Sequence, residues 1–87
     1  MREQTGLKYT DGTDICDGDI IVLWQEVESQ KKLLPYVRRV EWSNSHAAYA
    51  AVDGQYGWTD YLGKSVHDPN CRKVTKYVSA EAILKAL

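Results

Sequence analysis

Residues 6–24 read GLKYTDGTDICDGDIIVLW, and this stretch decides the fold class. It contains two tight-turn signals, Asp11-Gly12 and Asp17-Gly18, because glycine tolerates positive φ and aspartate can hydrogen-bond its own backbone. The second turn leads directly into the apolar run Ile20–Trp24. A short arm that turns back before a strongly apolar strand predicts a mainly β domain.

The rest of the chain continues the β pattern. Asp19–Val27 predicts the strongest strand, and apolar side chains on both of its faces predict an interior position in the sheet. Tyr36–Trp42 and Cys71–Val78 alternate between two faces, as strands do. The segment 46–52, HAAYAAV, favours a helix by its alanine content and a strand by its short length between turn signals. We predict a strand there, with Tyr49 as its main packing residue.

The connections carry their own signals. Residues 28–32 are polar and predict a solvated hairpin loop. Pro35 predicts the start of the next strand, because proline cannot donate a ladder hydrogen bond and belongs at a strand end or edge. Residues 55–63, QYGWTDYLG, predict a strand followed by an exposed loop. Ser79 predicts the cap of a short final helix, and the apolar spacing predicts the helix face that packs on the barrel: Ala80, Ile83, Leu84 and Leu87.

Composition limits the class of protein. The 87 residues predict one domain, 1–87, whose core holds a single cluster of side chains. The net charge of −1 excludes the concentrated positive field that nonspecific DNA coating needs, and it leaves a weak or local nucleic-acid contact open. The sequence has no secretory h-region and no apolar run that could span a bilayer, and its two cysteines suit a reducing compartment. We therefore expect a cytoplasmic protein without a membrane partner.

These patterns together predict an all-β fold. We expect a small SH3-like or related strongly bent β-barrel of five or six strands with a short C-terminal helix.

The order of residues in the opening segment resembles a known family. Thr5-Gly6-Leu7-Lys8, Asp11-Gly12 and Gly18-Asp19-Ile20-Ile21 look like the N-terminal signature of the YopX-like family of phage and prophage proteins, and Val40-Glu41-Trp42 resembles the family's later Val-x-Trp strand. The resemblance covers about the first quarter of the chain. It implies a mainly β domain, a phage or mobile-element origin and a bacterial host cytoplasm, and it implies no biochemical activity.

Reactive side chains form no strong motif. Cys16, His46, His67 and Cys71 are the residues that could make a tetrahedral zinc site or a cysteine–histidine nucleophile. Zinc modules usually show two close ligand pairs, and this chain shows one, so we predict no metal, no cofactor and no catalytic residue.

Aromatic residues form the best candidate for a binding surface. Tyr56, Trp58 and Tyr61 lie in a glycine-containing segment and could offer rigid contact area, with Arg38 as a nearby cation. The alternative is that Trp58 plugs one end of a small barrel.

The predicted function follows from this surface and from the absence of catalytic motifs. We expect a non-enzymatic phage or prophage accessory protein that binds a host or phage protein, or a second copy of itself through an exposed strand edge. The alternative is a nucleic-acid-binding module that uses Tyr56, Trp58 and Arg38.

Overall fold

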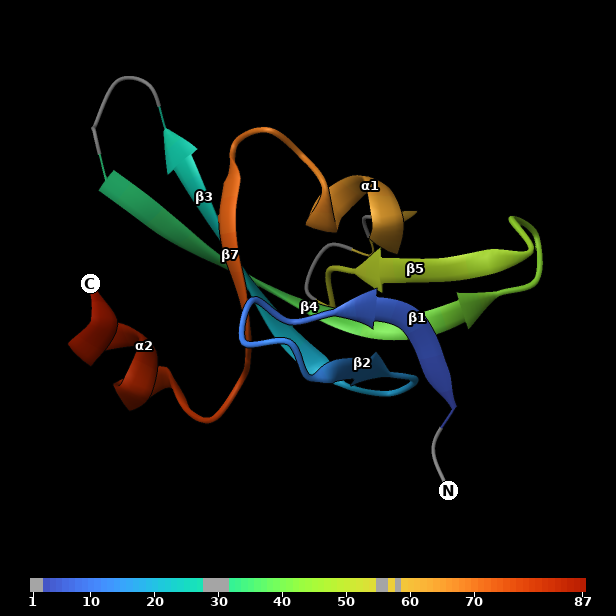
Figure 1. The fold of residues 1–87 in the computed structure, drawn as a ribbon, viewed down its shortest axis with the longest axis horizontal. Helices are drawn as coiled ribbons and strands as arrows, with labels where there is room; N and C mark the ends of the chain where they lie inside the picture. Colours follow the sequence, from blue (N-terminus) through green and yellow to red (C-terminus); the bar gives the residue numbers. More distant parts are fainter. Residues whose placement is uncertain (1–2, 28–31, 55–56, 58) are drawn as a thin grey trace.

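The computed structural model describes residues 3–27, 32–54, 57 and 59–87. Within these residues the chain forms seven strands in two antiparallel sheets, with two short helices (Figure 1). The elements in chain order are β1 (Gln4–Lys8), β2 (Asp14–Cys16), β3 (Ile20–Val27), β4 (Lys32–Ser43), β5 (Ala48–Val52), β6 (Thr59–Tyr61), α1 (Leu62–Val66), β7 (Cys71–Lys76) and α2 (Ala80–Ala86). The all-β class with a C-terminal helix is confirmed.

The larger sheet has the strand order β6-β5-β4-β3-β7, and β1 and β2 form a separate hairpin. The predicted barrel is not closed: β6 and β7 end the sheet, and no pairing between them occurs in the described part of the chain. The described residues form seven strands, slightly more than the expected number of about five or six, and the hairpin supplies two of them. That hairpin and α1 contribute side chains to the core, so the sheet buries its inner face without joining its edges.

The interior position of β3 is confirmed, since it pairs with β4 on one side and β7 on the other. Ile21 and Leu23 enter the core from one face of β3, while Val22 and Trp24 are buried on the opposite face. The core draws on the β1–β2 hairpin, β3, β4, β5, α1 and β7, and its buried members are Tyr9, Ile15, Ile21, Leu23, Val40, Ala51, Leu62 and Val74.

A buried carboxylate joins the hairpin to β3. Asp19 is 2% exposed, and its Oδ2 accepts hydrogen bonds from the Tyr9 hydroxyl at 2.7 Å and from the Cys16 amide at 2.9 Å. Gly18 precedes it at a φ of 86°, which favours glycine, and its amide donates to the Val40 carbonyl at 2.9 Å. The Gly-Asp step of the opening segment therefore holds both the turn and the hairpin in place.

The first Asp-Gly turn behaves as the sequence predicts. Asp11 Oδ1 accepts hydrogen bonds from the Thr13 hydroxyl at 2.6 Å and the Thr13 amide at 3.0 Å. These bonds stabilise the charged carboxylate and lower the pKa of Asp11. The aspartate is thus a turn residue, as expected.

The tip of the hairpin also reaches β7. The Thr10 amide donates to the Val74 carbonyl at 3.0 Å, and the Val74 amide donates to the Thr10 hydroxyl at 2.7 Å. Both backbone groups of Val74 are therefore satisfied by the hairpin.

Pro35 lies inside a strand, so the prediction that it begins one is wrong. It faces Trp24 in the middle of the β3–β4 pairing. The β4–β5 pairing covers only Arg39–Ser43, so among the described strands β4 has one neighbour at Pro35. Its missing amide thus falls at a strand edge, which is the position that proline tolerates. The predicted loop at 28–32 lies outside the described residues, except for Lys32 at the start of β4.

The strand predicted for 46–52 is confirmed as β5, but its packing differs from the prediction. Ala50 and Ala51 are buried, whereas Tyr49 is only partly buried against the core. The small side chains let α1 pack closely against β5. The exposed loop predicted to end at residue 63 is also wrong, because α1 begins at Leu62 and places that side chain in the core.

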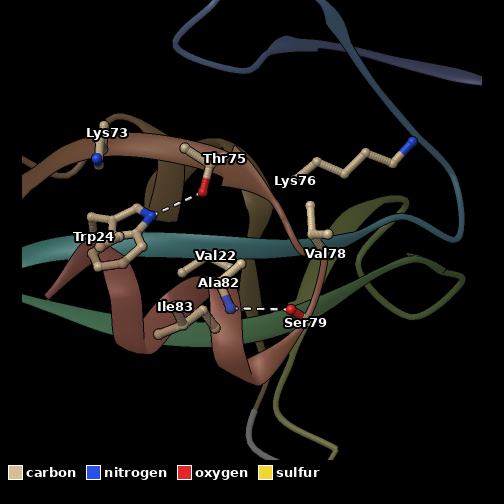
Figure 2. A pocket seen from close by; sticks show the side chains of 10 residues that line it. Val22, Trp24, Lys73, Thr75, Lys76, Val78, Ser79, Ala82 and Ile83 are labelled. Carbon is tan, nitrogen blue, oxygen red and sulfur yellow. Dashed lines mark hydrogen bonds between the residues drawn. The ribbon is translucent and has the colours of Figure 1, made fainter.

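Ser79 caps α2 as predicted, since its hydroxyl accepts the Ala82 amide at 3.1 Å. The predicted packing stripe is wrong for the two leucines: Leu84 is 69% exposed and Leu87 61%. Ile83 of the predicted stripe does face the sheet, and it lines the gap beside Trp24 together with Ala82 and Ala86 (Figure 2). No helix in the described residues is both long and apolar enough to cross a membrane.

Candidate protein-binding surface

A hollow of about 470 Å³ lies where β1, the adjoining ends of β4 and β5, and the start of α1 meet. We call it the aromatic hollow, and its lining residues are Thr5, Leu7, Trp42, Ala48, Tyr49, Tyr61, Leu62 and Gly63. Tyr61 is the one residue of the predicted binding set that lines it in the described part of the chain.

Trp42 and Tyr49 form one wall of the aromatic hollow. Their ring centroids are 5.1 Å apart with an interplanar angle of 78°, a favourable edge-to-face geometry. The Trp42 indole N–H also donates to Asn44 Oδ1 at 3.0 Å, which fixes the ring although it is 51% exposed. Partial burial and the nearby Glu3 carboxylate raise the pKa of the Tyr49 hydroxyl, so it keeps its proton to a higher pH than an ordinary tyrosine does.

Tyr61 also lines the aromatic hollow and is 47% exposed. Its ring meets the His46 imidazole edge-on, with centroids 5.1 Å apart. His46 Nδ1 in turn lies 2.9 Å from the Ser43 hydroxyl, so the imidazole is held by the turn between β4 and β5. Two half-exposed aromatic side chains are therefore presented in fixed orientations at one hollow.

The structure does not bring Arg38 to this surface. Arg38 lines a separate polar cleft, where its Nη1 lies 3.9 Å from Asp53 Oδ2 and its guanidinium stacks 5.5 Å above the centre of the Tyr36 ring. Its side chain is only 15% exposed, which offers little to a phosphate backbone. Tyr56 and Trp58, the other predicted binding residues, lie outside the described residues.

Trp42 is the residue that the sequence reasoning missed. Its alternation with Tyr36 and Val40 correctly predicts a shared strand face, and that face is buried at Val40. Trp42 lies one step beyond, where the core ends and the same face becomes the wall of the hollow. An aromatic residue at the end of an alternating strand, next to a polar turn, was the available signal.

A smaller gap of about 150 Å³ separates α2 from the outer face of β3 and β7 (Figure 2). The Trp24 indole N–H donates to the Thr75 hydroxyl at 2.9 Å, and Lys73 Nζ lies 4.9 Å from the centre of the Trp24 ring. Both interactions hold Trp24 flat on the sheet under the helix. α2 buries none of its own side chains, so it acts as a thin cover over this tryptophan.

The four candidate metal or nucleophile residues do not converge. In the part of the chain that the structure describes, no three His, Cys, Asp or Glu side chains are grouped so that they could hold a metal ion. Burial, with a smaller contribution from the Asp68 carboxylate, raises the pKa of the Cys71 thiol, which opposes the thiolate that a nucleophile requires.

No protein-family model matches the chain, and no curated protein or solved structure matches it either.

Proposed function

We propose that this chain is a non-enzymatic phage or prophage accessory protein that binds a protein partner at the aromatic hollow. The observation that carries the proposal is that Trp42 and Tyr61, each about half exposed, line the same hollow. Exposed apolar side chains that gather at one place on a small domain mark interaction sites more often than scattered ones do. The phage or prophage origin is supported by the resemblance of the opening segment to the YopX-like family.

The hollow has the properties of a binding hot spot. Tryptophan and tyrosine dominate such sites because they bury large areas while losing few rotatable bonds. Here Trp42 is restrained by Tyr49 and Asn44, and Tyr61 by His46, so little side-chain entropy remains to be lost on binding.

The lining also indicates the chemistry of the partner. Leu7, Ala48 and Leu62 add apolar lining, and His46, whose ring contacts the lining residue Tyr61, provides a polar group beside the hollow. A partner that inserts one aliphatic or aromatic side chain and surrounds it with hydrogen-bonding groups suits this pattern.

Co-purification from the bacterial host tests the proposal. We expect wild-type protein to retain a defined partner, identified by mass spectrometry, and Trp42→Ala or Tyr61→Ala to reduce its recovery at least about tenfold, as hot-spot truncations do. Leu84→Ala is the matched control, since Leu84 is 69% exposed on α2, away from the hollow. Sedimentation velocity on the same proteins shows whether the partner is a second copy.

Two results would count against the proposal. One is a strict monomer from which no partner is recovered. The other is a partner whose recovery is unchanged by Trp42→Ala while circular dichroism shows that the variant is folded.

A further inference from the structure

A second cavity, of about 400 Å³, lies between α1 and the inner face of the five-stranded sheet. We call it the polar cleft, and it is lined by Leu23, Gln25, Tyr36, Arg38, Asp60, Lys64, Ser65 and Asp68. Its volume falls within the range of small-molecule sites. Leu23 supplies an apolar floor, and the other seven residues are polar or aromatic, which is unusual for space beside a hydrophobic core.

The polar cleft contains hydrogen-bonding groups that the protein leaves unused. Ser65 is only 8% exposed, yet its hydroxyl makes no hydrogen bond within the described part of the chain. The side chains of Gln25 and Tyr36 also make no hydrogen bond within the described residues. Since the Ser65 hydroxyl is not among the fully buried unsatisfied atoms of the described residues, it opens into the cleft, where it can donate to or accept from a molecule that enters.

The charges around the polar cleft are balanced and held in place. Asp60 Oδ1 accepts the Tyr61 amide at 2.8 Å, and Asp68 Oδ1 accepts the Asn70 amide at 2.8 Å, so both carboxylates are oriented by backbone. Arg38 is oriented by its contacts with Tyr36 and Asp53.

Lys64 supplies the second cation, with its Nζ 3.7 Å from Asp60 Oδ2. This separation is longer than a charge-assisted hydrogen bond, which leaves the ammonium group able to reorient toward a ligand.

Two fixed anions and two cations disfavour a polyanion and favour a ligand that carries both signs. A carboxylate suits the guanidinium of Arg38 and the hydroxyl of Ser65, since arginine matches carboxylates in geometry. An ammonium group suits the carboxylates of Asp60 and Asp68. We propose that the polar cleft binds a small zwitterion of amino-acid size, with its carboxylate toward Arg38 and Ser65 and its ammonium group toward the two aspartates.

An NMR titration of the whole chain tests this site with a trio of related probes. L-leucine carries both charges, 4-methylpentanoate lacks the ammonium group, and isopentylamine lacks the carboxylate. We expect L-leucine, titrated to about 50 mM, to shift the amide signals of Gln25 and Ser65 and to bind at least about tenfold more tightly than either single-charge probe.

Variants connect the binding to the proposed residues. Ser65→Ala should weaken L-leucine about fivefold by removing the buried hydroxyl. Lys64→Gln should also weaken it, whereas Lys85→Gln should not. The latter is a matched control, because Lys85 pairs with Glu81 on α2 as Lys64 pairs with Asp60, and the two lysines are similarly exposed.

Three outcomes would overturn the zwitterion site: no shift at the polar cleft with L-leucine, equal affinity for 4-methylpentanoate, or tighter binding of inorganic phosphate. The result is separable from the aromatic hollow, because Trp42→Ala should leave the L-leucine titration unchanged.

Discussion

The buried contact between Tyr9 and Asp19 gives the sharpest test of how the opening segment is held. Tyr9→Phe removes a single oxygen atom and keeps the ring that packs in the core. Tyr9 is only 6% exposed, and its hydroxyl donates to Asp19 Oδ2 at 2.7 Å. The variant therefore deletes one hydrogen bond to a buried carboxylate with little change in volume.

The geometry sets the expected loss in the free energy of unfolding. Hydrogen bonds to charged groups contribute about 1.5–3 kcal/mol, and the loss is larger when an acceptor is left unsatisfied. Asp19 keeps the Cys16 amide as a donor at 2.9 Å, which places the expected loss near the lower part of that range, about 2 kcal/mol. With a urea slope of about 1.3 kcal/mol/M, the unfolding midpoint should fall by about 1.5 M.

Urea unfolding followed by tryptophan fluorescence measures this loss. Tyr77→Phe is the control, because the Tyr77 hydroxyl makes no hydrogen bond within the described residues, and its free energy of unfolding should change by less than about 0.5 kcal/mol. In an Asp19→Asn background the cost of Tyr9→Phe should shrink, since the acceptor is no longer charged. A Tyr9→Phe loss below about 0.5 kcal/mol, or one of equal size in both backgrounds, would refute the reasoning.

Three further predictions concern other parts of the chain. Gly18→Ala should lower stability by about 1–2 kcal/mol in a thermal melt, because the φ of 86° is strained for alanine although no atom lies within 4 Å of the added carbon; an unchanged melting temperature would contradict this. Removing residues 79–87 should leave the far-ultraviolet β signal in place and shift Trp24 emission to longer wavelength, and unchanged emission would rule out the covering role of α2. Burial raises the pKa of Cys71. In a Cys16→Ala variant, iodoacetamide should therefore alkylate Cys71 more slowly at pH 8 than it alkylates free cysteine, and the rate should rise only at higher pH. The raised pKa also means that the neutral thiol of Cys71 stabilises the folded state fully below the ordinary pKa of cysteine, and that this contribution is lost as the pH rises through the raised pKa. Alkylation of Cys71 as fast as that of free cysteine would contradict the raised pKa and the stability effect that follows from it.

The sequence predicted what depends on local pattern. Apolar residues on both faces of β3 predicted an interior strand, and the short length of segment 46–52 favoured a strand over the helix that its alanines suggest. The hydroxyl of Ser79 had only to reach an amide three residues away. Each of these outcomes is set by spacing along the chain, which a reader of the sequence can measure.

The parts that could not be predicted depend on which layer covers which face. Alternation gives the face that Arg38 occupies, but not that α1 lies over it and turns that face into a polar cleft. Leu62 looked like a loop residue because no repeating pattern marks a helix of five residues. The spacing of the apolar residues likewise did not give the rotation of α2, which turns Ile83 toward the sheet and leaves Leu84 exposed.

The bond between Thr10 and Val74 has a consequence for synthesis of the chain on the ribosome. The two residues are 64 positions apart, so the hairpin that emerges first cannot complete its contacts until β7 has also emerged. Until then Tyr9 and Ile15, which belong to the finished core, have no β7 to pack against. Contacts of such long range slow folding and prolong the exposure of apolar side chains. The nascent protein should therefore depend on chaperones from the emergence of the hairpin until β7 has also emerged.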